Sequence, residues 1–458
     1  MESKILDIKN AFYAFFQNKL ERFVKNSFIL NRIDELILFF IGATLFVSTF
    51  MESEKIAAPA IVVILLTVVK MFTKKGSKAR MTSWDAAIFV YFIICFISTI
   101  NSTLLAQSIH GFLKTIIYFF YYFCAANYFQ TNQNKIRYIF LLVGILCASE
   151  SLIAIYQNFA GVEQISTWQD SNYINPEDAI ARAYGTLKPY NPNLLGGYLL
   201  AGIPYILGAG AVCLVKKHYK TFQSSLLFFA VSSLAVFFTG SRGAYLGLGA
   251  IIAGIILIAG LLIKTDFAQE QKLKALYQKS VTAIVSMFAL VLIFVPKITK
   301  RLLSIFILRG DSSTSFRMNV YNSSWQMFCD NCILGIGAGN QTFREIYGLY
   351  MLTGYDALST YSVPLEIAVE SGIFGLIAFL AFIILFLISA FKFILKVCPK
   401  VLPDKIIVAA AILTILGVMT HGMFDTIYFR PQVQFLFWTM IAMSSAVLIN
   451  KNTEDETD

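Results

Sequence analysis

The sequence predicts an all-α polytopic membrane protein, and three observations lead to this prediction. Hydrophobic residues make up 57% of the 458 residues, charged residues only 14%, and the mean hydropathy is +0.68. A soluble domain of ordinary composition carries about 25% charged residues. The apolar residues also form continuous runs of about the length that crosses a bilayer, roughly 20 residues. They do not alternate with polar residues, which excludes the strands of a transmembrane barrel.

The apolar runs predict about 12 transmembrane helices by this length criterion. We place the spans at 36–52, 56–72, 84–100, 111–129, 136–156, 194–215, 222–239, 243–263, 281–295, 365–390, 405–420 and 434–449. Residues 36–449 then form one transmembrane domain. It follows an amphipathic N-terminal segment at 1–35 and precedes a short acidic tail at 450–458. Two connections are long, 157–193 and 296–362, and the second lies between spans 9 and 10.

The basic excess, a net charge of +10, is explained by the positive-inside rule. With a cytoplasmic N-terminus, the loops on the cytoplasmic face hold 25 of the 37 Lys and Arg residues, and the opposite face holds 11. Both termini are then cytoplasmic, and both long connections are external. Because topology accounts for the charge, the sequence gives no reason to expect a nucleic-acid partner.

The external connection 296–362 is the segment in which we expect the chemistry. It carries Arg317, Trp325 and the run Gly335-Ile-Gly-Ala-Gly-Asn340, and a loop of this length is usually functional or disordered. Its aromatic and glycine content favours an ordered structure. The glycine run lacks the Lys-Ser/Thr of a phosphate-binding loop and follows no βα unit, so we expect a tight loop that supports a site.

Cysteine and histidine usage favours no metal site. Four of the seven cysteines fall in or next to spans, where they behave as small apolar residues. Cys329-Asp-Asn-Cys332 is an isolated C-x-x-C, and zinc requires further ligands at a fitting spacing in a chain with only three histidines. This pair is either two unremarkable thiols or a redox-sensitive pair on an oxidising face.

Three ordered stretches resemble one family. They are Thr239-Gly-Ser241-Arg242-Gly243-Ala-Tyr245; Ser315-Phe-Arg317 through Trp325 to Gly335-Ile-Gly337-Ala-Gly339-Asn340; and Pro364-Leu365-Glu366-Ile-Ala-Val-Glu370-Ser-Gly372. Together they resemble the bacterial O-antigen ligase and O-antigen polymerase (Wzy/WaaL-like) superfamily, which also has one large external loop before a late span. The resemblance implies a multi-pass protein of the bacterial inner membrane. It also implies a glycosyltransferase that uses a polyprenyl-diphosphate-linked glycan and an acceptor hydroxyl, without a cofactor.

A fourth stretch points to one branch of this superfamily. His421-Gly-Met-Phe-Asp425 through Arg430-Pro431-Gln432, together with Asp356 through Glu366, is similar to IctB-type members, which are often labelled bicarbonate transporters. This similarity leaves an alternative function open, the transport of bicarbonate or another anion. The absence of a visible internal repeat favours the transferase.

A diphosphate leaving group requires fixed cations at the membrane surface, and the planar fork of arginine binds phosphate oxygens in pairs. The candidate substrate-binding residues on the predicted external face are Arg242, Arg317, Arg182 and Arg430. Two structural interpretations remain open. Arg242 is equally placed to anchor lipid phosphates at a helix end, and Arg317 with Trp325 to pack the loop.

An acceptor hydroxyl requires a positioned base. In the family, a His-Asn pair four residues before the leucine of the third stretch supplies a histidine that is taken as the base. Tyr361 and Ser362 occupy these positions here, and a phenol with a pKa near 10 is a poor base at neutral pH. The candidate catalytic residues are therefore His421, Glu366, Glu370, Asp425 and, as a substrate contact, Tyr361.

Each candidate base also has a structural interpretation. Glu366 and Glu370 share one helical face, and an ionisable group inside an apolar run faces the bundle interior, where it can serve only as a hydrogen-bond partner. A lone histidine such as His421 is often satisfied structurally. We further expect Glu150 in span five and Lys114 in span four to form a structural ion pair within the bundle.

Overall fold

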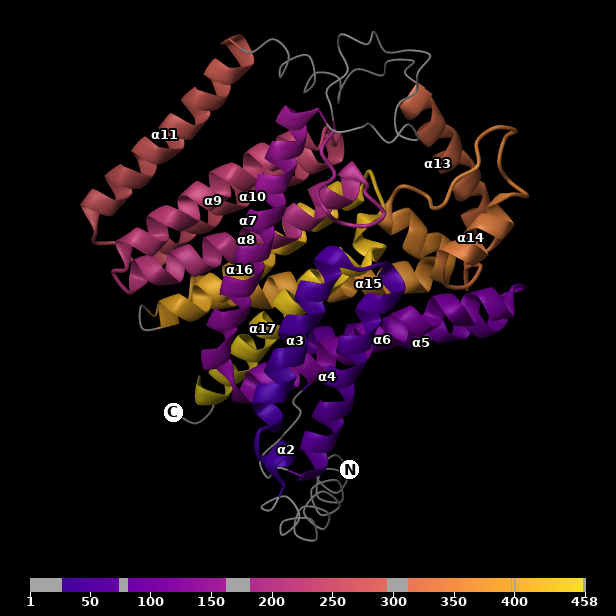
Figure 1. The fold of residues 1–458 in the computed structure, drawn as a ribbon, viewed down its shortest axis with the longest axis horizontal. Coiled ribbons are helices and arrows are strands. Elements are labelled where there is room, and N and C mark those ends of the chain that lie inside the picture. The colour runs from indigo at the N-terminus through magenta and orange to yellow at the C-terminus, as the bar shows by residue number, and fades with distance from the viewer. Residues whose placement is uncertain are drawn as a thin grey trace.

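The described residues of the chain fold as helices without any strand, as the predicted fold class requires (Figure 1). The computed structural model describes residues 27–73, 81–161, 182–294, 312–396, 398 and 401–455. Most of the expected amphipathic N-terminal segment therefore lies outside the described residues, as do the ends of the two long connections nearest spans five and nine. Helix α2 (Phe28–Asn31) is the part of that segment that can be described.

Within the described residues, eleven helices are long and apolar enough to cross a membrane. They are α3 (Ile33–Phe50), α4 (Ser53–Thr73), α5 (Ser83–Asn101), α6 (Leu105–Thr131), α7 (Ile136–Ala160), α8 (Pro192–Val215), α9 (Tyr219–Phe238), α10 (Arg242–Thr265), α15 (Val363–Leu395), α16 (Leu402–Gly422) and α17 (Pro431–Asp455). These match eleven of the twelve expected spans. The ninth, 281–295, falls in α11 (Gln271–Phe294), which lies at the edge of the molecule beside α10 (Figure 1). The count of twelve therefore stays a prediction.

Helix α17 forms the centre of the bundle, in contact with α3, α4, α6, α8, α15 and α16. All of its 18 most apolar consecutive residues are buried within the protein, because the helix is apolar on every side. Two of its hydroxyl groups have partners on neighbouring helices. Thr439 lies 2.8 Å from the hydroxyl of Tyr121, and Ser445 accepts a 3.0 Å hydrogen bond from the indole of Trp84.

Polar contacts show which helix ends share a face of the bundle. At one face, Lys405 and Asp266 form a fully buried 2.6 Å ion pair that joins the end of α10 to the start of α16. At the other face, Asn193 at the start of α8 donates to Asp425 in the connection that follows α16. The loops predicted to be basic and cytoplasmic thus gather at the Lys405 face, and the predicted external connections gather at the Asp425 face.

The Asp425 face carries a short helical layer made of α13 (Ser312–Asp330) and α14 (Asn340–Tyr347). In Figure 1 these two helices lie beside α15, far from α11, and they contact α15 and α6. Two short 3-10 turns, η1 (Gln133–Lys135) and η5 (Ile427–Phe429), complete the described elements. The described part of the long 296–362 connection is therefore ordered helix and tight loop.

The orientation of the two faces can be measured with native thiols. Cys329 is an exposed thiol at the end of α13, and Cys398 is half-buried at the opposite face. In variants that keep one cysteine each, we expect a membrane-impermeant maleimide to label Cys329 in intact cells, and Cys398 only after permeabilisation, because the more basic face stays in the cytoplasm. The reverse pattern would invert the orientation. Labelling of both thiols in intact cells would contradict the assignment of the two faces.

Candidate functional site

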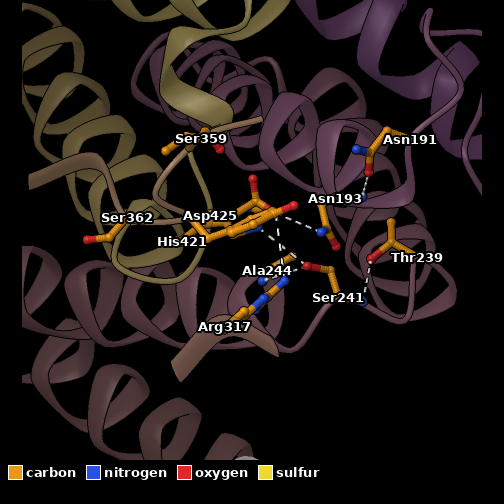
Figure 2. A network of polar contacts seen from close by, with 12 residues as sticks. Asn191, Asn193, Thr239, Ser241, Ala244, Arg317, Ser359, Ser362, His421 and Asp425 are labelled. Atoms are coloured by element: carbon orange, nitrogen blue, oxygen red, sulfur yellow. Dashed lines mark hydrogen bonds and ion pairs between the residues drawn. The ribbon is translucent and has the colours of Figure 1, made fainter. Parts of the chain in front are cut away.

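A network of polar side chains lies at the membrane face that carries α13 and α14, and Asp425 is at its centre (Figure 2). Asn193 Nδ2 donates a 2.7 Å hydrogen bond to Asp425 Oδ2, and Arg317 Nη2 lies 3.9 Å from the same oxygen. The two partners come from α8 and α13, which are far apart in the sequence. We call the set Arg182, Asn193, Ser241, Arg317, Tyr361, His421 and Asp425 the Asp425 network.

Arg182 holds the amide of Asn193 in a single orientation. Its Nη2 donates 2.9 Å to Asn193 Oδ1 and its Nε donates 3.0 Å to the carbonyl of Thr239. Because the amide oxygen accepts from Arg182, the amide NH₂ must face Asp425. Asn193 is placed by the helix start itself, where the Asn191 side chain caps α8 and Pro192 occupies the first turn.

His421 lies next to this carboxylate but is completely buried. Its Nε2 is 3.4 Å from the hydroxyl of Ser241, the N-cap of α10, and its Nδ1 has no hydrogen-bond partner. A Cβ at Gly243 would lie 2.7 Å from the imidazole, so this glycine allows the close packing. The histidine, which belongs to α16, is thus enclosed against the start of α10. Arg242, the first residue of α10, lies between Ser241 and Gly243 in the chain and is half-buried.

Tyr361 faces the charged part of the network. The Arg317 guanidinium carbon lies 5.5 Å from the centre of its ring. Burial first, and then the charge of Asp425, raise the pKa of the phenol above its ordinary value, and Arg317 and Arg430 oppose this shift. The phenol is therefore protonated at neutral pH and is able to donate a hydrogen bond. Its backbone is in the left-handed region, with φ of 56°, which is uncommon for a bulky residue.

Glu366 and Glu370 each hold a main-chain segment. Glu366, which is 1% exposed, accepts a 2.7 Å hydrogen bond from the amide of Thr360, and Glu370 accepts a 2.8 Å hydrogen bond from the amide of Gly339. Both carboxylates lie on one side of α15, as their spacing predicts. In this conformation they position the segments that lead to Tyr361 and to α14.

The glycine run is the tight supporting loop that the sequence predicts. Gly335, Gly337 and Gly339 all have positive φ. Gly339 packs so closely on Gly111 of α6 that a Cβ would lie 2.7 Å from the opposing Cα. The amides of Ile336 and Gly337 donate to main-chain carbonyls of α15, so the loop is fastened to the bundle.

The structure brings most of the candidate residues together at one face. Arg182, Arg317, Tyr361, His421 and Asp425 belong to the Asp425 network, and Arg430 is close enough to act on Tyr361. The expected pair of Glu150 with Lys114 is wrong: Glu150 accepts from the amide of Thr186 at 2.9 Å and also from its hydroxyl. Cys329 and Cys332 are both free thiols.

Sequence reasoning missed two members of the network. Asn193 is not among the candidate residues of the sequence analysis, and Ser241 appears there only within the stretch from Thr239 to Tyr245. Both positions carry a detectable signal, because a polar residue at or just after a helix N-cap, at the external end of a span, faces the same surface as the external loops. Among the described residues, no cluster of His, Cys, Asp or Glu has the arrangement of a metal site.

The fold and the site define a multi-pass helical membrane protein with an arginine-rich polar site at one membrane face. Residues 227–380 match the family model described as O-Antigen ligase. This match runs from α9 into α15 and includes α13, α14, Arg242, Arg317 and Tyr361, and it supports the O-antigen ligase and polymerase superfamily for this chain. A search of curated proteins gives no match.

We expect the removal of Arg182 to lower the stability of the protein more than the removal of Arg317. Arg182 donates hydrogen bonds to Asn193 and to the carbonyl of Thr239, whereas Arg317, 30% exposed, makes a long ion pair. Arg182→Ala should therefore lower the stability by at least about 2 kcal/mol, and Arg317→Ala by less than about 1 kcal/mol. Thermal unfolding of the purified variants in detergent measures both. Equal losses would contradict the division between a positioning arginine and an available one.

Proposed function

We propose that this protein is an inner-membrane glycosyltransferase of the O-antigen ligase or polymerase kind. It transfers a glycan from a polyprenyl-diphosphate carrier to an acceptor hydroxyl at the face that carries α13 and α14. The observation that supports this proposal best is the convergence of Arg317, Arg430 and Asp425 around Tyr361. These residues come both from within and from outside the segment that matches the O-antigen ligase family.

Arg317 is suited to hold the diphosphate. It makes a 3.9 Å ion pair with Asp425 and lies over the aromatic ring of Tyr361, and both contacts leave guanidinium N–H groups available. Arg242 adds a second guanidinium at the N-terminus of α10, where main-chain N–H groups and the helix dipole favour an anion. We propose that these two arginines hold the diphosphate together, with Arg430 nearby.

Asp425 is the best placed of the candidate bases. His421 is 0% exposed and Glu366 is 1% exposed, whereas the Asp425 side chain, beside Arg317, is 13% exposed. In the proposed step, the acceptor oxygen forms a bond to the anomeric carbon and its proton passes to the Asp425 carboxylate. The bond from the anomeric carbon to the diphosphate oxygen breaks, and the arginines stabilise the negative charge that leaves with the carrier.

The geometry gives less support to anion transport. A transport path requires polar groups from both faces that meet near the middle of the membrane. Here Glu150 accepts a hydrogen bond from Thr186 at the Asp425 face. Lys405 and Asp266 form an ion pair with each other at the opposite face. These charged groups therefore lie in separate layers near the two faces.

The arginine role predicts a selective loss of turnover. Arg317→Gln should cost roughly 2–4 kcal/mol of transition-state stabilisation, as for removal of one strong donor. Arg317→Lys should restore little of this, because lysine lacks the planar fork. The assay is transfer from a radiolabelled polyprenyl-diphosphate glycan by purified protein in liposomes. Arg344→Gln is the matched control, since Arg344 is an exposed arginine of α14 paired with Asp356.

The outcomes separate the two functions. Equal losses in the Arg317 and Arg344 variants would contradict a specific arginine role. If the protein turns over no glycan donor but binds bicarbonate, and if this binding requires Arg242, the result would favour anion transport over the transferase function.

The role of Asp425 can be tested with an isosteric change. Asp425→Asn keeps an oxygen that can accept from Asn193, so the fold should persist, but the base is removed. We expect transfer to fall by about 10²–10⁴-fold, the usual contribution of a general base, while donor binding is retained. If Asp425→Asn stays active and His421→Gln, folded to the same thermal midpoint, does not, His421 is the base instead.

A further inference from the structure

A second cavity lies beside α15, and its lining is separate from the Asp425 network. It has a volume of about 280 Å³ and is enclosed by α5, α6, the Ala338–Gln341 turn, α15 and the start of α17. None of the residues of the Asp425 network lines it. Its volume is close to the lower limit of small-molecule sites, roughly 300 Å³, which suits a ligand of one or two rings.

Two buried polar atoms in the cavity lining have no partner in the protein. The side-chain oxygen of Gln434 and the indole nitrogen of Trp438 are unpaired, in residues that are 6% and 7% exposed. The two residues are one turn apart on α17 and therefore share a face. One of these atoms only accepts a hydrogen bond and the other only donates one. A ligand that satisfies both must carry groups that donate and accept.

The other walls of the cavity also combine hydrogen-bond donors with acceptors. Glu370 and Lys114 also line the cavity, one supplying acceptors and the other donors. Carboxamides of Gln107 and Asn340 add groups of both kinds near the outer end of α6. A hydrocarbon chain would leave the polar atoms of Gln434 and Trp438 buried and unpaired.

Aromatic rings form much of the remaining wall. They are Tyr91, Phe92, Tyr118, Phe119, Tyr428, Phe429 and Trp438. Flat rings beside a few placed polar groups fit a ring-shaped ligand with apolar C–H faces and hydroxyl groups at its edge. Hydroxyl groups both donate and accept, as Gln434 and Trp438 require.

We propose that this cavity binds a saccharide ring, and that it is the site for the acceptor glycan. The binding itself is independent of the transfer reaction, but the assignment to the acceptor rests on the proposed function. Donor and acceptor then occupy two separate sites beside α15. The Glu370 carboxylate takes part in both regions, because it lines the cavity and holds the Gly339 amide of the loop that supports α14.

The test is direct sugar binding to the purified full-length protein, without any donor. The detergent must lack a sugar head group, so an amine oxide is used, and the probes are glucose, galactose, rhamnose and N-acetylglucosamine. Saturation-transfer NMR detects bound sugar, and titration gives the dissociation constant. We expect at least one of these sugars to bind with saturation, and Gln434→Leu and Trp438→Phe each to weaken it about 10-fold, as for one lost polar contact.

The Gln434→Leu variant should remain folded, because the carbonyl that it removes has no partner in the protein. Gln432→Leu is the matched control. Gln432 is also buried near the start of α17, but it does not line the cavity, and its amide donates to Lys188. Sugar binding should be unchanged in this control variant.

Failure of this proposal can be told apart from failure of the proposed function. Absence of binding by all four sugars, or equal binding by wild type and Gln434→Leu, overturns the saccharide cavity. If sugars bind as expected but no donor is turned over, the cavity stands and the transferase fails. If transfer occurs and Gln434→Leu leaves the acceptor KM unchanged, the acceptor assignment is overturned while the transferase stands.

Discussion

The arrangement of the site depends on a break in helix α15 at Gly372, because a membrane helix can be interrupted only where its freed main-chain groups find partners. Gly372 has φ of 69°, and a Cβ there would overlap the carbonyl of Ile333. The carbonyls of Val369 and Glu370 accept from the amides of Ile336 and Gly337 at 2.9 and 3.1 Å. Ser98 adds a 2.5 Å hydrogen bond to the Glu370 carbonyl. The glycine loop thus replaces the missing helical hydrogen bonds.

This exchange of hydrogen bonds explains why α13 and α14 are held against the membrane bundle. The loop that satisfies α15 connects these two helices, so fastening the loop fixes both of their ends. Arg317 on α13 is then brought to Asp425, which is itself placed by Asn193 and Arg182 from other segments. The network is locally rich in positive charge, a composition that favours an anionic substrate group.

The sequence predicts the spans well, because the length and continuity of apolar runs are set by bilayer thickness. The supporting role of the glycine loop could also be predicted, since Gly335-Ile-Gly-Ala-Gly-Asn340 lacks the residues of a phosphate loop. The break at Gly372 could not, because one glycine in a long apolar run is common in membrane helices. The partner of Glu150 was predicted wrongly, since the partners of polar groups depend on helix tilt and register, which composition does not report.

The sequence suggests candidate catalytic residues, but it does not show how exposed each side chain is. His421 has the side chain whose ordinary pKa is nearest neutral, but the structure encloses it between α10 and α16. Its position follows from Gly243, whose lack of a Cβ leaves room for the imidazole. Exposure is a property of three-dimensional packing, and it separates Asp425, a candidate base with some contact to solvent, from a buried neighbour four residues earlier in the chain.

Tyr361 stands at the position where the family pattern has a histidine, and its surroundings hold it in an unusual backbone conformation. Its left-handed backbone costs on the order of 1–3 kcal/mol, and three contacts hold it there. Glu366 binds the preceding amide, Tyr321 donates to the Tyr361 carbonyl at 3.2 Å, and Arg317 lies over the ring. A strained residue held by so many partners is kept for the position of its side chain. In the transfer that we propose, the phenol, whose pKa is raised, would offer a proton to a substrate oxygen, and removal of the acceptor proton would fall to the Asp425 carboxylate.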